Sequence, residues 1–257
     1  MSEIRKINDA SWATGGSVDH YATLDVREVE RVLVDRHHDA LSGRVLEVGV
    51  GAGRITQLLV PVASELVGID IAPAMVEHCR ARFPDARFEV GSLDRADAVV
   101  SPGFDAILAG FNVIDVVDDR ERAQTLDSWH DLLVPGGTLI FSTHNLPATS
   151  AIQRPGRILD RKRYVMADNV RHWRERRANH RRLAPLERDG EGWAIRNDEA
   201  EEHGLLHFYI ARDLQEGQLR AHGFEPLEVL DLDGNVLAGG ETAPHCAELH
   251  YVARRSA

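Results

Sequence analysis

Three glycines at alternate positions, Gly49, Gly51 and Gly53, follow an apolar run that begins at residue 44. Glycine has no side chain to clash and tolerates positive φ, so a turn of this kind lets the backbone approach a bound ligand closely. A dinucleotide-binding fingerprint would need its third glycine at position 54, where this chain has Arg54. The turn therefore predicts a ligand site for which NAD is not the favoured ligand.

Acidic residues accompany this turn at intervals along the chain. Glu47 precedes the first glycine, Asp70 closes the apolar run 65–70, and Asp94 follows the run 86–90. Carboxylates accept hydrogen bonds from hydroxyl and amino groups, so these positions are candidates for holding a polar ligand. Structural roles are the alternative: Glu47 as a buried acid satisfied by backbone amides, and Asp70 and Asp94 as helix caps.

Strands and helices are expected to alternate through most of the chain, because short apolar runs are separated by stretches with helical spacing. The expected strands span residues 44–49, 65–70, 86–90, 104–110, 137–143, 225–233 and 248–255, and the expected helices span 25–41, 54–63, 73–83, 119–133 and 212–224. This order indicates an α/β fold whose mostly parallel sheet is covered on both faces. Such sheets bind ligands at the carboxyl ends of their strands.

The alternation of strands and helices stops at residues 145–204, which are rich in arginine and contain three prolines. Two short runs, 192–196 and 205–210, are expected to pair as a hairpin at the end of this span. Long insertions in compact domains are often covers over an active site, so 145–204 is predicted to form a substrate-binding lid. The expected organisation is an N-terminal helical cap (1–40), a core domain (41–144 with 205–257) and the inserted lid (145–204).

The chain resembles class I S-adenosylmethionine-dependent methyltransferases. Its Glu47 and alternating glycines are similar to motif I of that family, and the resemblance continues through "LLVPGGTLIF" at 132–141 and "LRAHGF" at 219–224. It covers residues 44–143 and 205–254. It implies a Rossmann-like, seven-stranded, mostly parallel sheet sandwiched by helices, with S-adenosylmethionine as cofactor. It also implies that Asp70 binds the ribose hydroxyls and that Asp94 meets the adenine amino group.

Further cofactor candidates are neighbours of these motifs or belong to the expected cap. Met75 lies where the family packs apolar groups on adenine, with core packing as the alternative, and Phe111 follows the fourth strand, where the family contacts both cofactor and substrate. The full set of added cofactor candidates is Ile71, Met75, Ser92, Leu93, Phe111 and Tyr21.

Catalytic candidates are expected at the end of the fifth strand, where His144 and Asn145 would face the mouth of the site. An imidazole can take a proton near neutral pH, although His144 could equally hold the loop in shape. His207 and Tyr209 alternate on one strand and so share a face, either lining a substrate chamber or forming an amphipathic edge. Asn112 is a further substrate candidate.

No metal is expected. Asp115, Asp118 and Asp119 follow the fourth strand, but the fifth strand ends in His144 and Asn145 and adds no acid. Hard cations such as magnesium prefer several carboxylate oxygens.

Charge is distributed unevenly over the chain. The net charge is −11, but residues 151–182 carry +8, which leaves −19 on the remainder. Three arginines near the strand-five mouth, Arg154, Arg157 and Arg163, are candidates for binding a carboxylate or phosphate on the substrate, since the guanidinium fork suits such groups. A solvated helical face is the alternative reading of this basic segment.

Three classes of function fit these features. The first is methylation of an oxygen or nitrogen of a small metabolite or natural-product intermediate. The second is methylation of RNA or protein gripped by the basic insertion, which the acidic remainder disfavours for nucleic acid. The third is a cofactor-binding protein that does not methylate.

The sequence predicts a cytoplasmic protein without a membrane span or a disulfide framework. The N-terminus is charged, no long apolar run is present, and the only cysteines are Cys79 and Cys246.

Overall fold

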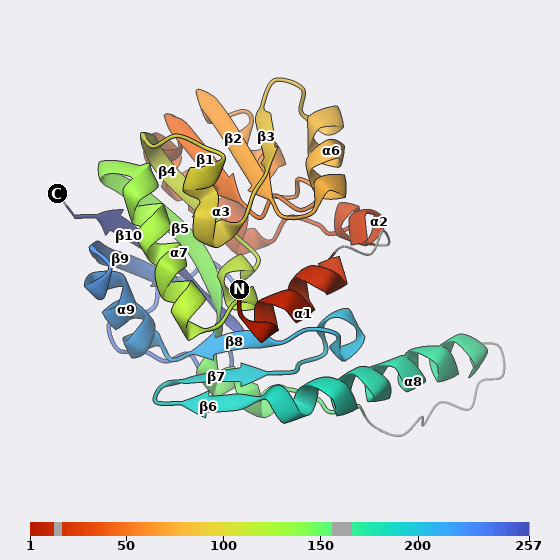
Figure 1. Cartoon of the computed structure of the whole chain (residues 1–257). Helices are drawn as coiled ribbons and strands as arrows, with labels where there is room; N and C mark the ends of the chain where they lie inside the picture. Colours follow the sequence, from red (N-terminus) through yellow and green to blue (C-terminus); the bar gives the residue numbers. More distant parts are fainter. Residues whose placement is uncertain (13–16, 156–165, 257) are drawn as a thin grey trace.

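The computed structural model describes residues 1–12, 17–155 and 166–256 (Figure 1). Its centre is a set of five parallel strands in the order β3-β2-β1-β4-β5. Their bounds are β1 Arg44–Val48, β2 Glu65–Asp70, β3 Arg87–Val90, β4 Phe104–Ala109 and β5 Leu133–Asn145. This confirms the predicted parallel α/β arrangement.

Two antiparallel strands complete a seven-stranded core on the far side of β5. β10 (Glu248–Arg255) pairs with β5, and β9 (Phe224–Leu230) pairs with β10. The predicted hairpin also forms, from β7 (Trp193–Arg196) and β8 (His207–Ile210), and β6 (Arg188–Gly190) adds to its edge.

The hairpin is part of the same sheet, which has ten strands in the described residues where seven were expected. β8 runs parallel to the last two residues of β5, with His144 opposite Tyr209 and Asn145 opposite Ile210. His144 also pairs with Glu248 of β10, so β8 takes the edge of β5 that β4 leaves uncovered after Ala109. A strand as long as β5 would otherwise present unpaired backbone groups there.

Helices cover both faces of the core sheet, as predicted. One face packs α7 (Asp119–Leu132) and α9 (Arg212–Ala221) through Leu126, Trp129 and Leu219. The other packs α3 (Glu28–Arg36), α4 (His38–Leu41) and α5 (Thr56–Leu59). α6 (Pro73–Arg82) begins with proline, which is favourable in the first turn of a helix, and packs on Phe88 of β3.

Two predicted helices are shorter than expected. The predicted helix 54–63 contains only the four residues of α5, because Pro61 has no N–H to donate to the carbonyl one turn earlier. The predicted helix 25–41 is divided into α3 and α4 at His37, whose φ of −108° and ψ of 25° are not helical.

The N-terminal residues dock against the added hairpin. α1 (Glu3–Trp12) buries Ile4 among Leu206 and Phe208, and α2 (Ser17–Ala22) follows it. The Asn8 side chain donates to the carbonyls of Val116 and Leu206, each at 2.8 Å, and accepts from the Leu206 N–H at 3.0 Å. Figure 1 shows α1 lying along β8.

The long helix α8 (Met166–Leu183) runs beside the hairpin and extends away from the core sheet in Figure 1. Asn179 and His180 join it to the loop before β8 through the Glu202 carbonyl and the Asn197 side chain. The remaining short helices are η1 Leu93–Ala98, η2 Val113–Val116, η3 Leu146–Ala151, η4 Ala184–Leu186 and η5 Ala200–His203. Within the described ranges, no helix is both long enough and apolar enough to cross a membrane.

A buried ion pair joins η2, α7 and β5. Arg122 and Asp115 are fully buried and bonded to each other, and Arg122 also donates to Thr143 Oγ1 at 2.9 Å and to the Gln215 side chain. Asp115 accepts from the Thr143 hydroxyl at 2.6 Å. Removal of either charge would leave the other unpaired in the interior.

We therefore expect Arg122→Ala to lower the free energy of unfolding by about 3–5 kcal/mol, the usual cost of stranding one partner of a buried pair. Urea denaturation followed by circular dichroism measures this. Arg120→Ala, at an exposed position of the same helix, is the matched control and should change stability by less than about 0.5 kcal/mol. Equal losses in the two variants would contradict the assignment.

Candidate functional site

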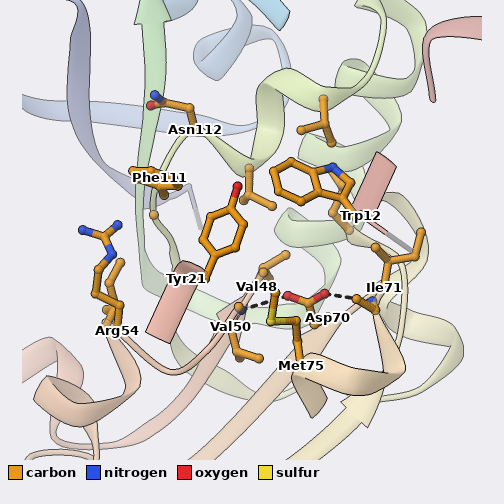
Figure 2. Close-up of a pocket in the computed structure, with 18 of the residues that line it drawn as sticks. Trp12, Tyr21, Val48, Val50, Arg54, Asp70, Ile71, Met75, Phe111 and Asn112 are labelled. Carbon is orange, nitrogen blue, oxygen red and sulfur yellow. Dashed lines mark hydrogen bonds between the residues drawn. The ribbon is translucent and has the colours of Figure 1, made fainter. Parts of the chain in front are cut away.

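A cavity of about 260 Å³ opens at the carboxyl ends of β1, β2, β4 and β5. Its walls come from the glycine turn after β1, the ends of β2 and β4, the N-terminal helices α1 and α2, and the start of β8. Figure 2 shows Tyr21, Phe111, Asp70 and Met75 around this space.

The three glycines of the turn have positive φ but different surroundings. A Cβ on Gly49 would lie 2.5 Å from the Val113 side chain, and one on Gly53 would lie 2.4 Å from Phe83. Gly51 faces open space, with no heavy atom within 4 Å of a Cβ built there. Gly49 and Gly51 line the cavity, whereas Gly53 does not and instead permits the close packing of Phe83. The stretch beside Gly51 is thus where a ligand can approach the backbone.

Asp70 holds the turn to the end of β2. Its Oδ2 accepts the N–H of Gly51 at 2.9 Å, and its Oδ1 accepts the N–H of Ala72 at 2.9 Å, the dashed lines of Figure 2. Burial raises the pKa of Asp70, against the effect of these backbone bonds. Each carboxylate oxygen has a further lone pair for a ligand hydroxyl.

Glu47 forms part of the cavity floor and is 2% exposed. It accepts the Thr56 hydroxyl at 2.7 Å. Burial raises the pKa of Glu47 to about 8, and the nearby carboxylates of Asp70 and Glu30 act in the same direction. The side chain is therefore mostly protonated at neutral pH.

Apolar and aromatic side chains form the walls nearest to Asp70. Met75, Ile71 and Leu93 line one side. Tyr21 packs against the cluster that contains Met75 and also contacts Trp12 and Phe111, with ring centroids 5.4 and 6.2 Å apart. A flat ring system with a polar rim suits such walls.

Phe111 and Asn112 lie in the turn after β4 and have left-handed backbone conformations, with φ of 54° and 58°. Non-glycine residues are uncommon there, and strain of this kind collects at functional sites. Arg27 and Arg54 lie over the Phe111 ring at 4.7 and 4.6 Å. Both arginines and Asn112 line the cavity, so this end of it is polar.

Each cavity arginine already contacts an acid. Arg54 pairs with Glu30 at 2.8 Å, Arg27 pairs with Glu248, and the Asn112 amide also donates to Glu248 at 2.7 Å. The N-terminal Arg5 donates to Asp94 at 3.2 Å and to the Ser92 hydroxyl at 2.7 Å. Arg5 lines the cavity and separates it from Ser92 and Asp94, which are not among the described lining residues.

His144 lies at the same polar end, beside Asn112 and Glu248, and is held by Asp115. The Asp115 Oδ2 atom is 2.8 Å from Nδ1 of His144 and accepts the His144 N–H at 2.6 Å. Burial acts to raise the pKa of Asp115, but Arg122 and these hydrogen bonds lower it below its ordinary value, so Asp115 is ionised. Nδ1–H then points to Asp115, which leaves the Nε2 lone pair beside Asn112 Nδ2 at 3.2 Å.

His207 forms a second pair of the same kind. Its Nδ1 is 2.7 Å from Asp198 Oδ2, which also accepts the Tyr209 hydroxyl at 2.8 Å. The His144 and His207 rings are stacked, with centroids 4.9 Å apart and planes at 25°. Both rings line the cavity, whereas Tyr209 is not among the described residues that do so.

Potential ligand atoms of His144, His207 and Asp198 lie within 4.8 Å of one another, so this cluster is where a metal ion would be sought among the described residues. Both Asp198 oxygens already accept hydrogen bonds, since Oδ1 takes the Ala200 N–H at 3.1 Å. These hydrogen bonds fix the orientation of the Asp198 carboxylate and of the His207 ring.

The other predicted site residues lie elsewhere. Asn145 is buried, and its amide donates to the carbonyls of Thr242, Ala243 and Cys246, so it fixes a loop. Arg154 is exposed and away from the cavity lining, and Arg157 and Arg163 lie outside the described residues.

Sequence reasoning missed several cavity residues. Arg27 and Glu248 lie outside the motifs, and Arg54 was noted only as a missing glycine. Asp198, in the insertion, was also missed; it does not line the cavity but binds His207, which does. Arg5 and Asp9 come from α1, for which the only prediction was that residues 1–40 form a helical cap. Their roles depend on long-range contacts that no local pattern encodes.

Known proteins resemble this chain in sequence over its central part. Residues 45–137 match the sequence model of the methyltransferase domain. A probable S-adenosylmethionine-dependent methyltransferase from Mycolicibacterium smegmatis is 33% identical over 115 residues, 44% of this chain and 43% of the relative. A ubiquinone biosynthesis O-methyltransferase from Xanthomonas campestris is 32% identical over 119 residues, 44% of this chain and 48% of that protein. The chain spans less than half the length of these curated relatives.

Solved structures share the fold over nearly the whole chain. An S-adenosylmethionine-dependent methyltransferase from Clostridium acetobutylicum has a TM-score of 0.59 at 12% identity, covering 92% of this chain and 94% of its own. An amino pentose methyltransferase from Micromonospora echinaspora, solved with S-adenosylmethionine, has a TM-score of 0.57 at 18% identity, covering 94% and 96%. Residues 45–137 of the chain therefore match a methyltransferase domain, and the chain as a whole shares the fold of S-adenosylmethionine-dependent methyltransferases.

Proposed function

We propose that this protein transfers a methyl group from S-adenosylmethionine to an oxygen of a small acceptor molecule, with a nitrogen acceptor as the alternative. The observation that carries the proposal is that one cavity joins the glycine turn and Asp70 to His144. A cofactor site and a proton acceptor thus open into the same space.

The residues present fit the cofactor. The open face of Gly51 leaves room for the amino-acid part, Asp70 can accept from a ribose diol, and Met75 and Leu93 suit an adenine ring. Asp94 would reach adenine only if Arg5 gave up its present contact. Bound S-adenosylmethionine supplies an electrophilic methyl group: as the acceptor oxygen bonds to that carbon, the carbon–sulfur bond breaks and leaves its electrons on sulfur.

The chain's own contribution to the reaction is alignment and proton removal. Nε2 of His144 accepts the proton of the acceptor hydroxyl, while Asp115 fixes the ring and stabilises the positive charge that forms. A hydroxyl needs such a base and a free amine does not, which is why oxygen is favoured. The names of the relatives include an O-methyltransferase and an amino pentose methyltransferase, and so support a small acceptor of either kind.

The cover over the acceptor is proposed to come from two parts of the chain. Trp12 and Tyr21 line the cavity from the cap, and Ala200 and Leu205 line it from the insertion, while no described residue of α8 does. Binding of an anionic acceptor by Arg154, Arg157 and Arg163 stays a prediction. Limited proteolysis with and without cofactor and acceptor tests the cover.

The RNA or protein methyltransferase remains the second candidate, and the exposed arginines of α8, such as Arg171, Arg174 and Arg181, are what favour it. Methyl transfer to bulk RNA or to protein, measured with labelled cofactor, would identify it. Cofactor binding without transfer to any acceptor would identify a non-methylating protein.

Asp70→Ala should weaken S-adenosylhomocysteine binding by about 1–3 kcal/mol, because it removes the charged acceptor of the ribose hydroxyls. Isothermal titration calorimetry measures the loss. Asp85→Ala, at an exposed position, is the control. Unchanged affinity in Asp70→Ala would exclude this residue from the cofactor site.

Cofactor binding should release a proton from Glu47. Its raised pKa means that the free protein is protonated there below about pH 8, and the cationic part of the cofactor favours the carboxylate. Affinity should therefore rise with pH between about 6 and 8 and level off above. Calorimetry in buffers of different ionisation enthalpy detects the proton, and Glu47→Gln should abolish it. Proton release of equal size in the variant would assign it to another group.

His144→Gln should lower kcat by about 10²- to 10⁴-fold, the usual contribution of a general base, and leave the Kd for S-adenosylhomocysteine within twofold. Steady-state assays with an acceptor found by product screening measure the first quantity. His38→Gln, at an exposed histidine, is the control. An unchanged kcat would indicate an acceptor that reacts without a base.

A further inference from the structure

We propose that His207 and His144 act as an acid and base pair on one acceptor, which therefore carries a carbonyl or carboxylate oxygen beside the hydroxyl that is methylated. This inference rests on the proposed function and adds a substrate class to it. In the proposed arrangement, His207 donates a hydrogen bond to the first oxygen and His144 takes the proton of the second.

The two histidines are built alike. Each turns Nδ1 toward a buried aspartate, Asp115 for His144 and Asp198 for His207, at 2.8 and 2.7 Å. Both rings line the cavity. Nε2 of His207 has no hydrogen-bond partner among the described residues and is left for the cavity, whereas Nε2 of His144 lies 3.2 Å from Asn112 Nδ2, which an acceptor hydroxyl would displace. The two rings are stacked with their centroids 4.9 Å apart, so one small acceptor in the cavity can contact both histidines.

The two aspartates differ in their other partners. Asp115 is bonded to the guanidinium of Arg122, so its charge is already neutralised without a proton on His144. Asp198 has no arginine or lysine partner in the described part of the chain; it accepts from Tyr209, Ala200 and His207. Among these three contacts, only His207 can carry a positive charge that balances the negative charge of Asp198.

The ionisation of His207 follows from this difference. Burial acts to lower the pKa of His207, but the charge and hydrogen bond of Asp198 outweigh it, with Asp115 and Glu201 adding to the effect, so the pKa is raised. The groups that face the ring are these three carboxylates, the Tyr209 hydroxyl and His144. The raised pKa favours the imidazolium form of His207, in which Nε2–H is a charge-assisted donor, whereas Nε2 of His144 faces the Asn112 amide as an acceptor.

Two such groups side by side select an acceptor with matching atoms. The base takes a hydroxyl proton, and the imidazolium binds a neighbouring oxygen lone pair and stabilises the negative charge that develops on the acceptor. An acceptor with a hydroxyl on one carbon and a carbonyl or carboxylate on the next provides both oxygens. Asp198 and Tyr209 are positioning residues, since they act through His207.

The charge states are tested directly by nitrogen-15 NMR of the imidazoles in the full chain loaded with S-adenosylhomocysteine and treated with EDTA. At pH 7, His207 should carry protons on both nitrogens. Asp198→Asn should make His207 neutral and leave His144 unchanged. Asp189→Asn, an exposed acid of β6, is the control and should change neither. A neutral His207 in the unaltered protein would overturn the proposal.

The substrate class is tested with three probes: salicylate, whose hydroxyl neighbours a carboxylate, 4-hydroxybenzoate, in which the two are remote, and phenol. Calorimetry on the same loaded protein should show that salicylate binds at least tenfold more tightly than the other two. His207→Gln should remove that preference, and His144→Gln should retain it. Equal binding of the probes, or no binding of salicylate, would overturn the proposal.

The same samples separate this inference from the proposed function. Loss of S-adenosylhomocysteine binding, or its insensitivity to Asp70→Ala, would count against the cofactor site itself. Tight cofactor binding together with a neutral His207 would leave the methyltransferase proposal standing and remove only the acid and base pair.

Discussion

The buried pair of Asp115 and Arg122 is the interaction on which both the sheet and the acceptor end of the cavity depend. Arg122 comes from α7, Asp115 from the turn after β4, and Thr143 and His144 from the end of β5. One pair of charges thus fixes three elements and also orients the proposed base. A buried ion pair contributes little net stability compared with apolar packing, so its value here is the geometry that it imposes.

Extension of the sheet gives the cavity its second histidine. β5 continues past the end of β4, and β8 pairs with its last two residues, so His207 and His144 come from neighbouring strands. The inserted hairpin therefore acts through strand pairing, which is rigid and sets side-chain positions more narrowly than a free loop would. The α8 helix, with most of the basic residues, stands outside this arrangement.

The parallel core and the ligand-binding edge could be predicted from sequence because their signals are local: apolar runs, helical spacing and alternating glycines. The pairing of the hairpin with β5 could not be predicted from sequence, because it depends on how many residues β5 extends beyond the end of β4. The same limit explains the site. Asp70 was predicted from its motif, whereas Arg27 and Glu248 line the cavity and form an ion pair between positions far apart in the sequence. Asn145 was misleading because its position beside His144 says nothing of the carbonyls it binds.

The side chain of Asn8 bonds both to the turn after β4, at Val116, and to the hairpin, at Leu206. Tyr21 adds a bond to Glu201 in the loop before β8. The first helix and the inserted hairpin therefore have to change together in evolution. A relative that acquired a different hairpin but kept this N-terminal helix would leave the buried Asn8 amide without its hydrogen-bond partner at Leu206. Recombination or engineering of acceptor preference in this fold therefore has to move both segments together.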